Sequence, residues 1–193
     1  DVVELTNLQR QVLYKESDCG KPKVECAQSA LAALNPGVRL VTRQHKVDET
    51  LWRGSSRNSP ASFDLVLDCT DNMAARHFLN RHCLATQTPL VSASAMGWEG
   101  QIATFDFARQ HSGCLACAIP EGSPEPIATC ANSGVIGPVL GAMGSLQAIA
   151  AIKVLLGQPI AHGQLQRFDG KRSTWFTLNI SPNPACGVCG PHV

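Results

Sequence analysis

The amino-acid sequence predicts an α/β fold in which a mostly parallel sheet is covered by helices and carries additional antiparallel strands. The apolar run Leu65–Leu67 stops abruptly in small polar and acidic residues and is followed by a helical pattern. Another apolar strand, Pro89–Ser94, comes after that helix at the spacing of a parallel crossover. Later, Asp169–Lys171 separates two short strand patterns and indicates a hairpin, which a parallel core readily accommodates.

Length and composition fit a single domain that spans residues 1–193. The chain is 44% hydrophobic and has a formal net charge of +1, which indicates a soluble protein without a nucleic-acid-binding surface. The sequence opens without Met and without a signal segment, inside what resembles a working motif. We therefore expect that the amino-terminal βαβ start of the fold is missing from it.

One uncharged stretch, residues 131–152, is long enough to span a membrane. It contains Pro138, Gln147 and glycines at three- and four-residue spacing, which place a smooth stripe on one face of a helix. Such a stripe suits close packing on a sheet or on another helix, although similar stripes also occur between membrane helices. We interpret the stretch as a helix of the folded domain and expect no contact with a membrane.

Hydrophobic periodicity predicts the individual elements. Asp1–Leu5 indicates the last part of a strand, and apolar residues from Val24 to Leu34 fall on one stripe of a helix that begins near Lys23. Asn35–Gly37 ends this helix. Strands are predicted at 38–42, 65–68, 89–94 and 101–105, and two hairpin strands at 165–168 and 174–178. A helical turn is predicted at 48–52, a loop at 54–62, a helix at 74–84 and the longest helix at 133–156.

Asp71 and Asn72 directly follow the central strand. In open α/β sheets, ligands bind at the carboxyl ends of the strands, because loops converge there and the next helix presents its amino terminus. These two residues are therefore candidates for binding a ligand. The alternative is that Asp71 simply caps the following helix.

Two further groups of residues indicate anion binding. Thr6–Gln11 packs amide, hydroxyl and guanidinium donors into six residues, among them Asn7 and Arg10. Lys23 lies in the first turn of its helix, where its charge opposes the helix dipole unless an anion is bound between them. The alternatives are an ordinary polar turn and a solvated lysine.

The strongest signal is a pair of CxxC motifs, formed by Cys114, Cys117, Cys186 and Cys189. Each motif can place two thiolates on one cation, and two motifs complete a tetrahedral shell with no open position. We therefore expect a structural Zn²⁺ that pins the carboxyl tail to a loop in the middle of the chain. The alternative is a pair of redox dithiols.

Cys130 stands apart, in a loop just ahead of the longest helix. A thiol near a helix amino terminus can have a lowered pKa and act as a nucleophile; the alternative is a buried small hydrophobic residue. We apply this second interpretation to Cys19, Cys26, Cys69 and Cys83. Nine cysteines, an odd number that includes two CxxC motifs, favour the reducing cytoplasm over a secreted disulfide scaffold.

Together these motifs resemble the ThiF/MoeB/HesA family of adenylyltransferases, which are related to ubiquitin-activating (E1) enzymes. The resemblance covers essentially the whole chain and implies a Rossmann-like fold with a four-cysteine zinc clip. It is carried by Asp1–Gln11, Lys23, Cys69–Asn72, both CxxC motifs and Gly137–Ala148. Within the family, Phe168–Lys171 followed by Trp175, and Thr129–Cys130, most resemble the branch that adenylates the sulfur carrier ThiS in thiamine biosynthesis.

The resemblance implies a reaction and a set of site residues. ATP, with Mg²⁺, would adenylate the Gly-Gly tail of a ubiquitin-like sulfur carrier and release pyrophosphate. Arg10 and Lys23 would contact the phosphates, Asn7 would help to orient them, and Asp71 would hold Mg²⁺, with Asn72 beside it in the nucleotide site.

The resemblance also implies partners. The loop 108–132 would cross the nucleotide site, and Cys130 would link to the carrier through an acyl disulfide. The family further implies a homodimer and a sulfur donor of the cysteine desulfurase or rhodanese type.

The glycine-rich phosphate loop of the family would precede residue 1, so we expect the chain alone to bind ATP poorly. The alternatives are activation of the molybdopterin-synthase carrier and a non-catalytic, zinc-stapled subunit that only docks a ubiquitin-like protein.

Overall fold

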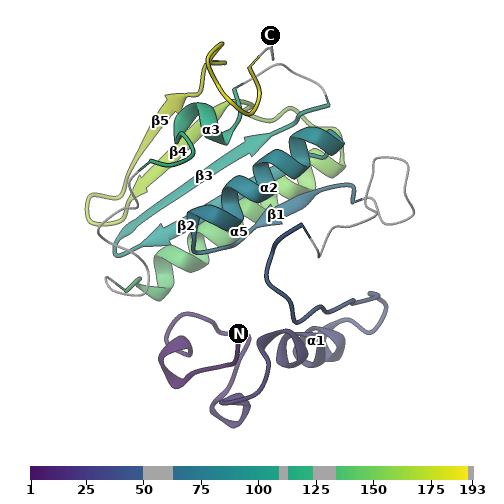
Figure 1. The fold of residues 1–193 in the computed structure, drawn as a ribbon. Helices are drawn as coiled ribbons and strands as arrows, with labels where there is room; N and C mark the ends of the chain where they lie inside the picture. The colour runs from purple at the N-terminus through teal and green to yellow at the C-terminus, as the bar shows by residue number, and fades with distance from the viewer. Residues whose placement is uncertain (50–62, 109–112, 124–133, 191–193) are drawn as a thin grey trace.

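The computed structural model describes residues 1–49, 63–108, 113–123 and 134–190, and its centre is a five-stranded sheet with the order β1-β2-β3-β4-β5 (Figure 1). The strands are β1 Val66–Asp68, β2 Leu90–Met96, β3 Glu99–Phe105, β4 Gln164–Asp169 and β5 Thr174–Asn179. Every strand predicted from residue 65 onward is thereby confirmed.

The three longer helices that periodicity predicts are confirmed as well. α1 spans Lys23–Leu34, α2 spans Met73–Thr86 and α5 spans Gly137–Leu155. The last of these begins later than expected, because Pro138 in its first turn disfavours helical backbone before it. Three short helices complete the described chain: η1 Leu5–Asn7, η2 Glu16–Asp18 and α3 Leu115–Ala118.

The prediction of a mostly parallel sheet is wrong for the described residues, because the sheet is mixed. β1 and β2 run parallel and are joined through α2, with Leu67 opposite Val91. The β2–β3, β3–β4 and β4–β5 ladders are antiparallel. β2 and β3 run antiparallel because a tight turn, Gly97–Trp98, joins them, and Gly97 adopts there a φ of 56° that glycine reaches without strain. This turn reverses the chain at once and leaves no room for a second crossover helix.

Helices α2 and α5 cover opposite faces of the sheet (Figure 1). Leu90 of β2 packs in a core cluster with Leu79 of α2, whereas its neighbour Val91 packs in another cluster with Leu146 of α5. Successive side chains of a strand point to opposite faces, so the two clusters mark the two sides of the sheet. The central strands are therefore buried on both sides, as the continuous apolar runs predict.

Two strands predicted in the first part of the chain are wrong. Residues Val38–Thr42 join no ladder within the described residues, and Val41 is 67% exposed. In place of a strand over Asp1–Leu5, Val2 forms an isolated bridge with Pro22, and a 3₁₀ turn begins at Leu5. An apolar pattern produces a strand only where another strand supplies hydrogen bonds. The loop predicted at 54–62 and most of the turn predicted at 48–52 lie outside the described residues.

By length and composition alone, α5 could cross a membrane. In the fold it lies instead along β2 and β3 and buries the residues that face the sheet, Val139, Met143, Gln147 and Ala151. Packing on the sheet uses only this face, because Ile149, Ile152 and Leu155 are about half exposed. The predicted close packing along the glycine stripe is wrong at Gly141 and Gly144, which are exposed and have open space where a Cβ would lie.

Candidate functional site

The chain turns from β1 into α2 around the fully buried carboxylate of Asp68. This carboxylate accepts hydrogen bonds from the backbone N–H and the hydroxyl of Thr70, at 2.9 and 2.6 Å. It accepts a third, at 2.6 Å, from the hydroxyl of Ser92 on β2. Three donors satisfy a group whose burial would otherwise be costly, and they hold the loop that follows.

Asn72, not Asp71, is the residue that caps α2. The Oδ1 atom of Asn72 accepts a hydrogen bond from the N–H of Ala75 at 2.9 Å, as an N-cap side chain does. Asp71 is exposed, and the Nδ2 of Asn72 donates to its carboxylate at 3.4 Å. The alternative role of Asp71 as a helix cap is therefore removed, and its carboxylate is accessible at the carboxyl end of β1.

Residues 1–34 form a folded unit, which we call the N-terminal unit. The backbone of Val3 donates to the carbonyl of Lys21 at 2.9 Å and accepts from Gly20 at 2.8 Å. These bonds bring the first residues of the chain beside the start of α1, where the N–H of Lys23 donates to the carbonyl of Asp1 at 3.0 Å. The ammonium of Lys23 forms an ion pair with the carboxylate of Asp1, at 3.3 Å.

The same unit contains Asn7 and Arg10. Asn7 is buried, and its Oδ1 accepts a hydrogen bond from the N–H of Glu4 at 3.1 Å, which closes the turn of η1. Arg10 is partly exposed and donates from Nη1 to the carbonyl of Thr6 at 2.9 Å. One turn thus carries a fixed amide and a guanidinium with donors to spare for an anion.

The N-terminal unit docks at the sheet edge where Asp71 lies. The side-chain amide of Gln9 donates to the carbonyl of Val135 at 3.2 Å, and a Cβ on Gly137 would lie only 2.6 Å from the carbonyl oxygen of Gln9. Val135 in turn pairs with Gly97, which directly follows β2. Because β1 and β2 are parallel, their carboxyl ends share one edge. The N-terminal unit and the loop of Asp71 therefore occupy the same edge of the sheet.

The β4–β5 turn reaches this edge as well. The N–H of Gly170 donates to the carbonyl of Trp98, in the β2–β3 turn, at 2.8 Å, and a Cβ on Gly170 would lie 2.6 Å from that oxygen. Phe168 packs on Trp175 with ring centroids 4.9 Å apart. The motif Phe168–Lys171, which the sequence singles out, is thus part of the edge where the candidate site lies.

The four cysteines of the two CxxC motifs, Cys114, Cys117, Cys186 and Cys189, converge in one cluster. Their sulfurs all lie within 4.8 Å of one another, with 3.9 Å between Cys114 and Cys186 and 3.3 Å between Cys117 and Cys189. In a tetrahedral zinc site with bonds of about 2.3 Å, neighbouring sulfurs lie about 3.8 Å apart, whereas a disulfide needs about 2.05 Å. The cluster fits one metal ion held by four thiolates.

The thiols of this cluster differ in their pKa. Burial raises the pKa of the Cys114 and Cys189 thiols. Burial also opposes ionisation of the Cys186 thiol, but backbone N–H groups of Cys189 and Val188 and neighbouring thiols lower its pKa to about 7. Asn80, which sequence analysis missed, is fully buried on α2 and accepts from the N–H of Leu115 at 3.0 Å. This hydrogen bond joins the first CxxC motif to the buried face of α2. The sequence around Asn80 does not indicate this role, because the partner lies 35 residues away.

Cys130 lies outside the described residues, as do all but residues 108 and 113–123 of the predicted crossover loop 108–132. The short helix α3 belongs to the described part of that loop.

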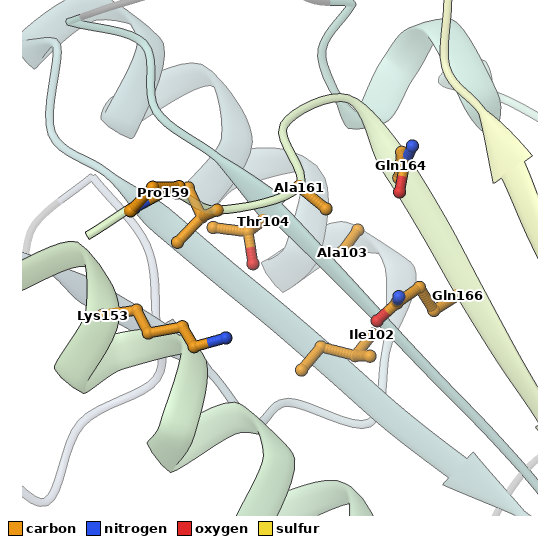
Figure 2. Close-up of a pocket in the computed structure, with 9 residues that line it drawn as sticks. Ile102, Ala103, Thr104, Lys153, Pro159, Ala161, Gln164 and Gln166 are labelled. Carbon is orange, nitrogen blue, oxygen red and sulfur yellow. The ribbon is translucent and has the colours of Figure 1, made fainter.

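A cavity of about 160 Å³ lies away from the candidate site (Figure 2). Figure 2 shows Lys153 on one side of it, and Gln166, Ile102 and Thr104 on the other. Lys153 lies in the last turn of α5, whereas Val135 precedes the first turn. The cavity therefore belongs to the end of the helix remote from the edge that carries Asp71.

Comparison with known proteins identifies relatives over the whole chain. A family model described as the ThiF family matches residues 1–188. The sulfur carrier protein ThiS adenylyltransferase of Escherichia coli (strain K12) is 42% identical over 190 residues, which cover 98% of this chain and 73% of that protein. The molybdopterin-synthase adenylyltransferase of Salmonella typhimurium is 38% identical over 192 residues, which cover 98% of this chain and 74% of the relative.

Another relative, the adenylyltransferase and sulfurtransferase MOCS3 of Aedes aegypti, is 40% identical over 195 residues; the chain spans only 43% of its length. Among solved structures, E. coli MccB with ATP superposes with a TM-score of 0.79 at 21% identity, over 98% of this chain and 57% of MccB. MccB with succinimide gives a TM-score of 0.80 at 20% identity, over 98% and 56%. At this identity the likeness concerns the fold, which is of the Rossmann-like MccB type.

Proposed function

The chain belongs to the ThiF family, and from this premise we propose that it adenylates the Gly-Gly carboxylate of a ubiquitin-like sulfur-carrier protein. The chain is an adenylyltransferase, as its named relatives are. In the proposed reaction, the carrier's terminal carboxylate attacks the α-phosphate of ATP. The products are a carrier acyl-adenylate and pyrophosphate.

The observation that carries this proposal is the shared sheet edge. The N-terminal unit, with Asn7, Arg10 and Lys23, docks at the edge of the sheet that also carries the loop of Asp71. The reaction brings a carboxylate and a triphosphate together, and these anions repel each other unless cations lie between them. We assign Arg10 and Lys23 to the phosphates and Asn7 to their orientation. The placement of Asn7 and Arg10 in one turn, and of Lys23 at the start of α1 beside Asp1, supports this assignment.

Asp71 is the residue that we assign to Mg²⁺. A single exposed carboxylate suits this ion, because Mg²⁺ usually keeps several waters and shares phosphate oxygens. When bound, Mg²⁺ would offset the charge that builds up on the phosphates. Asn72 supports the carboxylate of Asp71 through its Nδ2 while its Oδ1 caps α2.

The proposal also specifies which carrier protein is the substrate. We favour a ThiS-like carrier over the molybdopterin-synthase carrier, because Phe168–Lys171 and Trp175 resemble the thiamine branch and lie at the candidate edge. Exchange of pyrophosphate into ATP, measured with each carrier and the full-length protein, tests this choice. We expect kcat/KM at least about tenfold higher with the ThiS-like carrier. A preference for the other carrier would contradict the specificity, and exchange with neither would contradict the function.

A non-catalytic docking subunit is the rival from another class of function. Such a subunit needs the fold and the cysteine cluster but has no use for a polar nucleotide site. The joint presence of Asn7, Arg10, Lys23 and Asp71 argues against it. The same exchange assay separates the two, because a docking subunit would bind the carrier without any turnover of ATP.

Cys130 gives a prediction that separates activation from sulfur transfer. Adenylation needs phosphate and metal contacts but no protein thiol, whereas transfer of the activated carboxylate to sulfur chemistry can use a thiol in the loop 108–132 that we propose crosses the site. With the carrier, ATP and a persulfide donor present, we expect Cys130→Ser to keep pyrophosphate exchange and to lose a reducible, carrier-dependent adduct. This adduct is an acyl disulfide, formed when a persulfide on Cys130 displaces AMP from the carrier acyl-adenylate. Intact-mass spectrometry with and without reductant measures this adduct. If the adduct survives the substitution, or exchange is lost with it, Cys130 has another role.

We further propose that the cysteine cluster holds a structural Zn²⁺ and that the protein works in the reducing cytoplasm. The chemistry of four thiolates supports zinc, and the odd number of cysteines with two CxxC motifs supports a reducing compartment. The sulfur donor, of the cysteine desulfurase or rhodanese type, and the homodimer remain predictions from the family resemblance.

A further inference from the structure

Gln147 is a polar residue buried in the most apolar helix of the chain. It lies at the centre of α5, is 4% exposed, and is surrounded in sequence by Leu146 and Ala148. Burial of an amide without hydrogen-bond partners costs free energy, so the donors and the acceptor of this side chain are expected to form hydrogen bonds. The proposed reaction does not itself require Gln147.

The side-chain amide of Gln147 bonds the last residue of β1 and the second residue of the neighbouring strand β2. Its Nε2 donates to the carbonyl of Asp68 on β1 and to the carbonyl of Val91 on β2, each at 2.9 Å. An amide nitrogen has two hydrogens, so each strand receives one. The Oε1 accepts from the thiol of Cys69 at 3.4 Å. All three bonds of the side chain therefore converge on the point where the chain leaves β1.

This point is where the β1–β2 ladder stops. The last paired residues are Asp68 and Ser92, and Asp71 follows three residues later. Past the end of the ladder, the backbone needs donors from elsewhere to keep a fixed path. Gln147 supplies them from the α5 face of the sheet.

Arg76 provides the matching contacts from α2, on the opposite face. Its Nη2 donates to the carbonyls of Thr70 and Ala93, the latter at 3.3 Å, and the residue is 6% exposed. Gln147 thus bonds the carbonyls of Asp68 on β1 and Val91 on β2. Arg76 bonds the carbonyls of Thr70, in the loop after β1, and of Ala93 on β2. The segment that leads to Asp71 is held from both sides of the sheet.

We propose that Gln147 is a positioning residue for the nucleotide site: it fixes the end of β1 and so holds Asp71 where Mg²⁺ and the phosphates need it. This inference rests on the proposed function. A carboxylate that shares a metal with phosphate oxygens must be held within a fraction of an ångström of its place. Mutation of the residues that position a metal ligand commonly lowers metal affinity or activity by roughly 10–100-fold.

The test uses Gln147→Met in the full-length protein. Methionine keeps the length and volume of the side chain but has no donor for either carbonyl. We expect the Mg²⁺ concentration for half-maximal pyrophosphate exchange to rise by about tenfold or more. We also expect amide hydrogens of residues 69–72 to exchange faster with deuterium, in the protein without nucleotide.

Met143→Ala is the matched control. Met143 is equally buried, lies one helical turn earlier on the same face of α5, and packs against Gly100 instead of bonding carbonyls of β1 and β2. Its truncation should lower stability without shifting the Mg²⁺ midpoint. Gln147→Glu gives a second, gentler variant: as a buried neutral acid it keeps one O–H donor, and it should lie between the wild type and Gln147→Met.

Two results would overturn the inference. One is a Mg²⁺ midpoint in both Gln147 variants equal to that of the wild type and of Met143→Ala. The other is unchanged deuterium exchange at residues 69–72. Failure of the proposed function has a different signature, because the wild-type protein would then show no carrier-dependent exchange at all, while the deuterium measurement would still decide whether Gln147 holds this segment.

Discussion

Replacing Asp71 by alanine should lower carrier-dependent exchange of pyrophosphate into ATP by about 100-fold or more while the fold stays intact. A 100-fold loss corresponds to about 2.7 kcal/mol of transition-state stabilisation, which is within the range of a metal contact at a phosphoryl group. The fold should tolerate the change, because the side chain of Asp71 is exposed and does not cap α2. Exchange assays and thermal unfolding, measured on the same preparation, check both halves of the prediction.

Two control variants identify the cause of this loss. Asn72→Ala removes the observed cap of α2 and should cost about 1 kcal/mol of stability. Asp64→Ala removes an equally exposed carboxylate shortly before β1 and should leave exchange and stability unchanged. If Asp71→Ala retained exchange close to the wild-type rate, Asp71 would have no part in the reaction.

Replacing Cys189 by serine should release the metal and destabilise the carboxyl tail. We expect one tightly held zinc ion per chain in the wild type and close to none in the variant, because a closed four-thiolate shell loses most of its affinity with one ligand. A stability loss of about 3 kcal/mol would lower the melting temperature by roughly 6–12 °C. Metal analysis of protein purified under reducing conditions, together with thermal unfolding, measures the effect.

The prediction of buried cysteines is confirmed for Cys26 and Cys83 and is wrong for Cys19 and Cys69, which are exposed. Cys19→Ser is the control for this experiment, because Cys19 is an exposed free cysteine outside the cluster. It should change neither zinc content nor melting temperature. Wild-type protein that is freshly purified, reduced and free of zinc would exclude the zinc site.

The sequence predicts the elements whose signal is local. The unit β1-α2-β2 and the long helix α5 follow from apolar runs and periodicity, which depend only on neighbouring residues. The strand predicted at Val38–Thr42 fails, because pairing requires a neighbour in space that periodicity does not reveal. The Gly97–Trp98 turn escapes prediction for a related reason: only the left-handed backbone of Gly97 identifies it as a reversal.

The residues of the candidate site and of the cysteine cluster also differ in whether the sequence alone predicts their roles. CxxC spacing alone predicts which cysteines converge, since each motif brings two sulfurs to one point. The sequence does not distinguish Asp71 from Asn72 as the cap of α2, because both residue types favour that position. Gln147 and Asn80 escape it entirely, because their roles depend on backbone groups 35 to 79 residues away.

The most direct test of the proposed adenylation is the intact mass of the carrier after incubation with ATP, Mg²⁺, pyrophosphatase and the full-length protein. We predict that a ThiS-like carrier ending in Gly-Gly gains the mass of one AMP, and that neither a carrier without this tail nor a reaction with Asp71→Ala shows the gain. A wild-type reaction in which ATP is present and the mass of the carrier does not change would contradict the proposed function.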